Sequence, residues 1–169
     1  MKDPGDRVPN VSIPSSGRGN SIDGKTWINP SPNQLARALA RNEKPIREED
    51  KFDVAAMHDF ITSGTWSEIM RYEELHPETT EQVTLSSFHG MDGIWSPKAV
   101  FVHYYNYLRY GVDIWPYDRH DWIVNRGDRE VRYVIDYYGE GDEYTIDARP
   151  ALDSIDALID RVKIVVEDI

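Results

Sequence analysis

Apolar side chains recur at the spacing of amphipathic helices in several stretches of the chain. The first stretch carries Leu35 and Leu39 behind a helix-start signal, in which Ser31 can act as the N-cap and Pro32 as the first helical residue. Pro45 is incompatible with a continuing helix. The pattern therefore predicts a helix that begins at residue 32 and ends before Pro45.

Two further helices are predicted on either side of a break at Ser63-Gly64. The first covers about 53–62, and the second begins at Thr65, where Thr65 and Glu68 form a capping-box pattern, and ends before residue 77. A final amphipathic helix is predicted near the C-terminus. Its apolar positions are Leu152, Ile155, Leu158, Ile159, Val162 and Val166.

Strand signals, which are runs of alternating apolar and polar positions, are concentrated in the second half of the chain. Gly127-Asp128 separates two such runs and is typical of a hairpin turn. The strands expected are 83–88, 121–126, 129–138 and 144–149. The predicted fold class is therefore α+β, with several helices packed on a small antiparallel β-meander.

An aromatic stretch lies ahead of these strands. It holds Phe101, Tyr104, Tyr105, Tyr107, Tyr110 and Trp115. The enrichment of aromatic residues inside proteins favours a helix whose rings pack into a core. A hydrophobic wall for a ligand is the alternative interpretation.

Residues 1–26 are rich in Pro, Gly and Ser and poor in apolar side chains, so they predict an extended arm. A domain covering residues 27–169 follows. The 169 residues are 40% hydrophobic, which is enough for a single core.

Charge and cysteine content narrow the function classes. With 30 acidic and 19 basic residues, the formal net charge is −11. Nucleic-acid binders neutralise phosphates with basic residues, so we expect no nucleic-acid partner and instead a cationic one. The chain has no cysteine, which excludes disulfides, thiolate zinc sites and cysteine nucleophiles.

Two features are candidates for a functional site, namely one histidine and one cluster of charged residues. A single histidine on the apolar side of a helix, such as His58, is more often a core residue than a metal ligand. The densest charged cluster, Asp118-Arg119-His120-Asp121, enters a strand in which Arg119 and Asp121 face one side and His120 the other. Such charges either form ion pairs that fix the meander or bind carboxylates, including heme propionates. Spacing alone leaves both interpretations open.

Five sequence segments carry a more specific signal, because they occur together and in order. They are WINPSP (27–32) followed by Gln34, SPKA (96–99), PYDRHDWIVNR (116–126), EVRYVIDYY (130–138) and DARPALDS (147–154). This set resembles the signature of the mitochondrial cytochrome c heme lyases, also called holocytochrome c synthases. The resemblance covers residues 12–163 or so, and His58 matches the helix that carries the family's heme-ligating histidine.

The resemblance implies an enzyme that binds heme b and apocytochrome c as substrates. Such enzymes join the heme vinyl groups, as thioethers, to the two cysteines of a CxxCH segment. His58 is implied as the catalytic residue and the ligand of the heme iron. The remaining residues implied for the heme site are Trp27, Pro30, Arg119, His120, Asp121 and Arg126. The implied location is the mitochondrial intermembrane space, peripheral on the inner membrane.

The chain departs from the family pattern near the implied site. Asn29 stands where the family usually has Tyr, Asp59 stands in place of Asn, and Ser63 stands in place of Glu. These departures motivate an alternative hypothesis, a catalytically inactive heme-lyase-like subunit of a respiratory complex in the inner membrane. The intact His58 and the DRHDW segment favour the enzyme.

Overall fold

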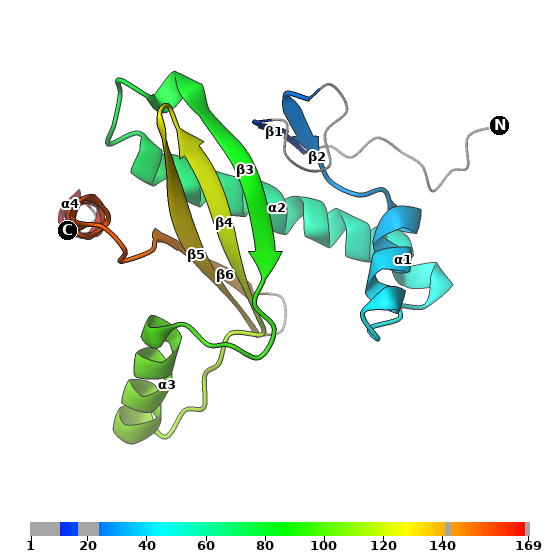
Figure 1. Cartoon of the computed structure of the whole chain (residues 1–169). Helices are drawn as coiled ribbons and strands as arrows, with labels where there is room; N and C mark the ends of the chain where they lie inside the picture. The colour runs from blue at the N-terminus through cyan, green and yellow to red at the C-terminus, as the bar shows by residue number, and fades with distance from the viewer. Residues whose placement is uncertain (1–10, 17–23, 141–142, 168–169) are drawn as a thin grey trace. The chain divides into compact units, whose positions relative to one another are not determined.

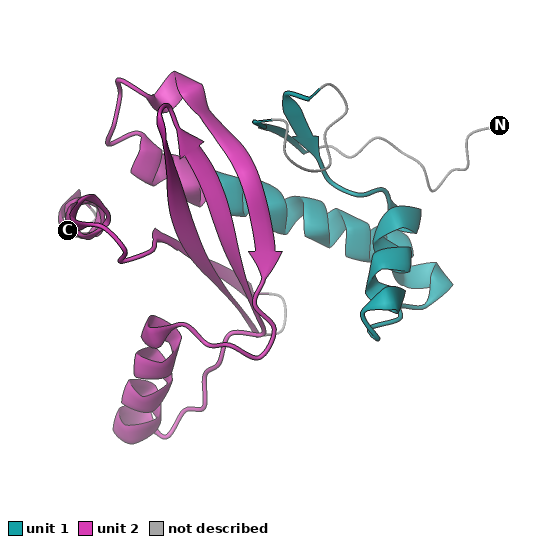
Figure 2. Cartoon of the chain, viewed as in Figure 1, with its two compact units in different colours: residues 1–66 teal, residues 67–169 magenta. Residues whose placement is uncertain are grey.

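The computed structural model describes residues 11–16, 24–140 and 143–167 (Figure 1). The chain divides into two compact units, residues 1–66 and 67–169 (Figure 2). Helices accompany a two-stranded sheet in the first unit and a four-stranded antiparallel sheet in the second, which confirms the predicted α+β class. Within the described ranges, no helix is both long and apolar enough to cross a membrane.

The first unit is organised around a short strand pair and the helix that follows it. Strands β1 (Ser12–Pro14) and β2 (Thr26–Ile28) are antiparallel, and Ile13 lies opposite Trp27 with both side chains buried. Helix α1 (Pro32–Arg41) begins as predicted. Its cap is reciprocal, because Ser31 Oγ accepts the Gln34 N–H while the Gln34 side-chain oxygen accepts the Ser31 N–H.

The predicted arm is only partly described, since residues 1–10 and 17–23 lie outside the described ranges. Within it, β1 pairs with β2, and the Ser15 N–H donates to the Lys25 carbonyl at 2.7 Å. The boundary at residues 26 and 27 stays a prediction.

The predicted helix break at Ser63-Gly64 is wrong. A single helix, α2 (Lys51–Glu73), follows the short 3₁₀ turn η2 (Glu48–Asp50) and runs through both residues. The Thr65 hydroxyl does not cap a new helix but donates to the Ile61 carbonyl one turn earlier, at 2.8 Å. One glycine inside a helix costs about 1 kcal/mol, which burial of Thr62, Thr65 and Ile69 along the helix can outweigh.

The second unit contains a meander in which each strand pairs with its sequence neighbour. After the 3₁₀ turn η3 (Thr80–Gln82), its strands are β3 (Val83–Gly90), β4 (Asp118–Arg126), β5 (Arg129–Glu140) and β6 (Glu143–Pro150). The hairpin turn predicted at Gly127-Asp128 is confirmed. Gly127 has φ +66°, and a Cβ there would lie 3.2 Å from Thr79 Cγ2, so glycine suits the position on both counts.

The two faces of this sheet differ in chemistry. One face is apolar and buried, with Trp122 opposite Tyr133 and Val124 opposite Leu85 and Val131. Tyr72 of α2 packs on this face, its ring edge-on to Tyr133 at 6.1 Å. The other face carries charged residues of β4, β5 and β6, including Arg119, Asp121 and Asp136, because side chains alternate along each strand. Arg126 at the end of β4 is the exception, since it shares the face of Trp122 and Val124.

Helix α3 (Pro97–Tyr110) contradicts the prediction that its rings pack into a core. Only Ala99 and His103 of this helix are buried, and the His103 ring stacks on Trp115 at 3.9 Å. The outward aromatic residues, which we call the α3 ring surface, are Phe101, Tyr104, Tyr105, Tyr107 and Tyr110.

Helix α4 (Ile155–Glu167) is confirmed as a helix, but its predicted apolar stripe faces outward. The buried residues of α4 are Ala157, Asp160 and Ile164. Two polar anchors hold this orientation, since Asp160 is paired with Arg126 and Arg161 donates to the Pro150 carbonyl at 2.7 Å.

Candidate functional site

His58 lies on the half of α2 that belongs to the first unit, and its side chain is half-buried. Ala55, His58, Asp59 and Thr62 follow one face of the helix at three- and four-residue spacing, and Ala55 and Thr62 are buried. The described residues contain no group of three or more His, Cys, Asp or Glu side chains that could hold a metal ion. Heme iron needs only axial ligands from protein, so a single histidine suffices for that chemistry.

A partly buried hydrogen-bond chain joins Trp27 to the turn of α2 that carries His58. The Trp27 indole Nε1–H donates to Asn29 Oδ1 at 3.2 Å, and Asn29 Nδ2 donates to Asp59 Oδ1 at 2.8 Å. Asn29 is only 2% exposed. Pro30 follows Asn29 directly and is half-buried. Three residues implied for the heme site, Trp27, Pro30 and His58, therefore belong to the first unit; Trp27 is part of this chain, and Pro30 and His58 are sequence neighbours of Asn29 and Asp59.

Two departures from the family pattern are partners in that chain. Asn29 and Asp59, 30 positions apart in the sequence, form its second hydrogen bond. The third departure, Ser63, is exposed on α2. Asn29 and Asp59 therefore share a structural role in this protein.

The other four implied site residues lie on β4 in the second unit and do not form one cluster. Arg119 binds Asp121 Oδ1 at 3.1 Å and the Ile94 carbonyl at 3.1 Å, and Arg132 binds the second Asp121 oxygen at 2.9 Å. His120 points to the opposite face, where its ring meets Tyr137 edge-on at 5.7 Å. Arg126 lies six residues beyond His120 on the same strand, which is a separation of roughly 20 Å at 3.3 Å per residue.

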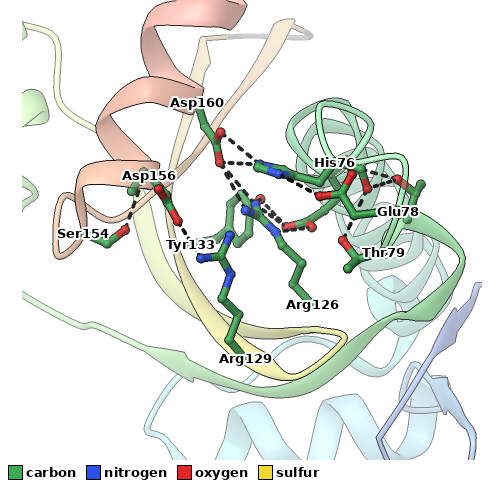
Figure 3. Close-up of polar contacts among 12 residues, drawn as sticks. His76, Glu78, Thr79, Arg126, Arg129, Tyr133, Ser154, Asp156 and Asp160 are labelled. Atoms are coloured by element: carbon green, nitrogen blue, oxygen red, sulfur yellow. Dashed lines mark hydrogen bonds and ion pairs between the residues drawn. The ribbon is translucent and has the colours of Figure 1, made fainter.

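Arg126 sits at the centre of a buried ionic network (Figure 3). Its guanidinium donates to Glu73 at 2.6 and 3.0 Å and to Asp160 Oδ2 at 3.3 Å. The Tyr133 hydroxyl donates to Glu73 Oε1 at 2.6 Å, and His76 Nε2 lies 2.9 Å from Asp160 Oδ1. The network joins α2, the β4–β5 hairpin and α4.

Burial and pairing shift the pKa values of this network. Burial alone would lower the pKa of Arg126, but the hydrogen bond and the charge of Glu73 outweigh it and raise the pKa. Burial, and then the negative charge of Glu73, raises the pKa of the Tyr133 hydroxyl. Arg126 therefore stays charged and Tyr133 stays protonated at neutral pH.

A second buried network joins three of the family-like sequence segments, SPKA, EVRYVIDYY and DARPALDS. Ser96 caps α3 by accepting the Ala99 N–H at 3.1 Å, and its hydroxyl donates to Asp136. Arg149 donates to Asp136 at 2.5 Å and to Ser96 Oγ at 2.7 Å. Lys98 pairs with Asp147 at 2.7 Å, so the SPKA and DARPALDS segments meet at two points.

These contacts bear on the two interpretations left open for the arginines. Arg119, Arg126, Arg132 and Arg149 each bind a carboxylate of the protein itself, as expected for ion pairs that fix the meander. The binding of heme propionates by Arg119 and Arg126 stays a prediction. Of the β4 residues implied for the site, His120 has the most accessible side chain, at 28% exposure.

A cavity of about 320 Å³ lies beside these arginines, between the β4–β5 hairpin and the start of α4. Arg126, Arg129 and Arg132 line it together with Asp153, Asp156 and Asp160. Each of these arginines is ion-paired with at least one of the three aspartates. The lining is therefore close to charge-balanced and includes no residue of the first unit.

Sequence reasoning missed Glu73, His76 and Asp160 as members of a polar network. His76 reads as isolated along the chain, yet it bonds Asp160, which lies 84 positions away. Asp160 sits between apolar residues of an amphipathic helix, where an acidic residue indicates only a solvated face. No local spacing signal could have found these contacts.

The chain is similar to known heme lyases along most of its length. The family model described as cytochrome c/c1 heme lyase matches residues 4–165. Holocytochrome-c synthase of Saccharomyces cerevisiae is 35% identical over 89% of this chain and 64% of the yeast protein. Holocytochrome c-type synthase of Homo sapiens is 36% identical over 83% of this chain and 54% of the human protein.

A relative named for another cytochrome aligns over a shorter part of this chain. The putative holocytochrome-c1 synthase of Schizosaccharomyces pombe is 32% identical over 66% of this chain and 50% of its own length. The chain spans between half and two thirds of the length of these curated relatives. No solved structure matches it.

Proposed function

Since the chain belongs to the cytochrome c/c1 heme lyase family, we propose that it is a holocytochrome c synthase with heme b and apocytochrome c as substrates. In the proposed reaction, each thiol S–H of a CxxCH segment adds across one heme vinyl group. A carbon–sulfur bond forms, the S–H bond breaks, and the hydrogen ends on the terminal vinyl carbon without net oxidation. Because this chain has no cysteine, both thiols come from the substrate.

The observation that carries the proposal is the position of His58 next to the Trp27–Asn29–Asp59 chain. It places the segment 27–32 and the helix with the implied iron ligand in direct contact within one unit. A neutral imidazole is a standard ligand of heme iron. In this proposal His58 holds the iron while Trp27 and Pro30 border the heme.

The residues on β4 receive different roles in the proposal. Arg119, Asp121 and Arg126 act as positioning residues, because each is already engaged by a buried ion pair, and at either arginine a propionate would compete with a carboxylate of the protein. His120 is the member of the set with an accessible side chain and is proposed to contact substrate.

Cytochrome c is the proposed protein substrate. The yeast and human relatives named for cytochrome c cover 89% and 83% of this chain, against 66% for the Schizosaccharomyces pombe relative named for cytochrome c1 and 76% for that of Chaetomium thermophilum. A net charge of −11 suits a cationic apocytochrome, because complementary fields speed encounter. We therefore expect association to slow as salt screens the attraction.

We also propose a peripheral position on the inner membrane, facing the intermembrane space. The α3 ring surface supports it, since exposed Tyr and Phe side chains suit the headgroup level of a bilayer. Flotation with phosphatidylcholine vesicles tests this. Phe101→Ser is combined with Leu108→Ser, since Leu108 is a further exposed apolar residue of α3, and Val165→Ser on α4 is the control. Equal flotation of both variants would contradict a role for α3.

Coexpression with apocytochrome c and heme tests the activity. We expect covalent c-type cytochrome in the wild type and none with His58→Ala. If no product exceeds the lyase-free control, the activity is refuted. A heme-free protein that copurifies stoichiometrically with a respiratory complex would instead support the non-catalytic subunit.

A further inference from the structure

We infer that the chain Trp27–Asn29–Asp59 is a positioning device that fixes the turn of α2 on which His58 sits, so that the imidazole is held in one orientation for binding heme iron. The inference rests on the proposed function, because it gives His58 an iron to bind. It assigns Asn29 and Asp59 as positioning residues that act through His58 without touching the iron.

The direction of the chain follows from the chemistry of its groups. An indole N–H can only donate, so the Asn29 oxygen faces Trp27. The Asn29 NH₂ group must then face Asp59, whose carboxylate accepts at 2.8 Å. Each member therefore has one defined role, and the Asn29 amide cannot flip without losing both bonds.

The two ends of the chain are anchored in rigid structure. At one end, Trp27 is paired across the strands with Ile13, which is 1% exposed. At the other end, Asp59 lies in the interior of α2, next to His58 and on the same face as the buried Ala55 and Thr62. A rotation or a slide of α2 against β2 would break the Asn29–Asp59 bond, so the bond resists the two movements that would displace His58.

Residue chemistry at these two positions provides a rescue test. Asp59→Asn retains an acceptor oxygen, so Asn29 can still donate to it. Asn29→Asp places two carboxylates against each other and removes the donor. The double exchange Asn29→Asp with Asp59→Asn restores a donor–acceptor pair with its direction reversed, and the indole still finds an acceptor.

The experiment compares heme complexes of purified variants, using heme itself as the probe. The readouts are the ferric visible and electron paramagnetic resonance spectra, which report axial ligation, and the rate of heme transfer to an apomyoglobin scavenger. Circular dichroism melts report folding. Asp53→Ala, which removes an exposed carboxylate from the same helix, is the matched control.

We expect Asn29→Asp and Asp59→Ala to alter the axial-ligand spectrum and to release heme about 10- to 100-fold faster, the range typical for partners that orient a metal ligand. Asp59→Asn and the double exchange should match the wild type. If Asn29→Asp fails to fold, the double exchange must still restore both folding and the wild-type spectrum. A double exchange as defective as Asn29→Asp would overturn the inference.

Different results would contradict the proposal that His58 is the heme ligand and the inference that Asn29 and Asp59 position it. If His58→Ala binds heme with the wild-type spectrum, His58 is not the ligand and the proposed site itself is wrong. If His58→Ala loses heme while Asn29→Asp and Asp59→Ala behave like Asp53→Ala, the ligand stands and the positioning role is refuted.

Discussion

Glu73 and Arg126 form a two-point ion pair in which both side chains are almost completely buried. The Arg126 Nε and Nη2 groups reach the two Glu73 oxygens at 2.6 and 3.0 Å, and the side chains are 2% and 0% exposed. The pair links the last turn of α2 to the last residue of β4. Tyr133 adds a third hydrogen bond to Glu73, so the carboxylate has partners on two strands.

Removing Glu73 should destabilise the protein strongly. Glu73→Ala leaves Arg126 and the Tyr133 hydroxyl facing a void, and breaking one side of a buried pair costs about 3–5 kcal/mol. The free energy of unfolding from urea titration measures the loss. Glu74→Ala, an exposed neighbour, is the control and should leave stability nearly unchanged. Equal stability of the two variants would show that the pair contributes little.

Tyr138 on β5 should ionise late in an alkaline titration. Burial, followed by the negative charges of Asp136 and Asp147, raises its pKa to about 12. The unfolded chain releases this proton near pH 10, so the folded state binds more protons between pH 10 and 12. The stability linked to this raised pKa is fully present below pH 10 and is lost as pH rises to 12.

Tyrosinate absorbance of the wild type and of Tyr138→Phe measures this shift. Their difference curve should rise near pH 12, while the protein is still folded by circular dichroism. A difference curve centred near pH 10 would contradict the assigned pKa.

His58→Ala should abolish stable heme binding and leave the fold largely intact. Alanine is the best helix former, and His58 is only half-buried. Soret absorbance measures heme binding, and a circular dichroism melt measures folding. If the variant unfolds while its folded fraction keeps full heme, then His58 is a core residue.

Local sequence signals predicted those structural features that are determined by residues adjacent in the chain. The Ser31–Gln34 cap starts α1, and Gly127 with its positive φ turns the β4–β5 hairpin. The alternation that separates Arg119 from His120 also holds, because strand geometry depends only on neighbouring residues.

The structural features that the sequence could not predict depend on contacts between residues far apart in the chain. Glu73 and Arg126 are 53 positions apart, and no periodicity relates them. The continuity of α2 through Gly64 depends on residues buried along the rest of the helix. In α4, Asp160 is buried because it pairs with Arg126 and His76. The apolar stripe of that helix therefore faces outward, whereas an amphipathic helix ordinarily buries its apolar face.

Arg126 and Arg129 form a matched pair with which the contribution of a buried ion pair to stability can be compared with that of an exposed one. They are cross-strand neighbours on one hairpin, and each binds a carboxylate of α4, Asp160 for Arg126 and Asp156 for Arg129. The Arg126 side chain is 2% exposed and that of Arg129 is 47% exposed. The hydrogen bond from Arg129 lowers the pKa of Asp156, whose side chain is 52% exposed.

Arg126→Ala should therefore cost about 3–5 kcal/mol in the free energy of unfolding, because it removes the buried cation that Glu73 and Asp160 share. Arg129→Ala should change stability little, since water replaces Arg129 around the exposed Asp156. Urea titrations at low and high salt measure both effects, and only the small Arg129 contribution should fade at high salt. Any loss of heme binding by Arg126→Ala should then follow its loss of folded protein. A variant that stays fully stable yet sheds heme would instead place Arg126 in direct contact with a propionate.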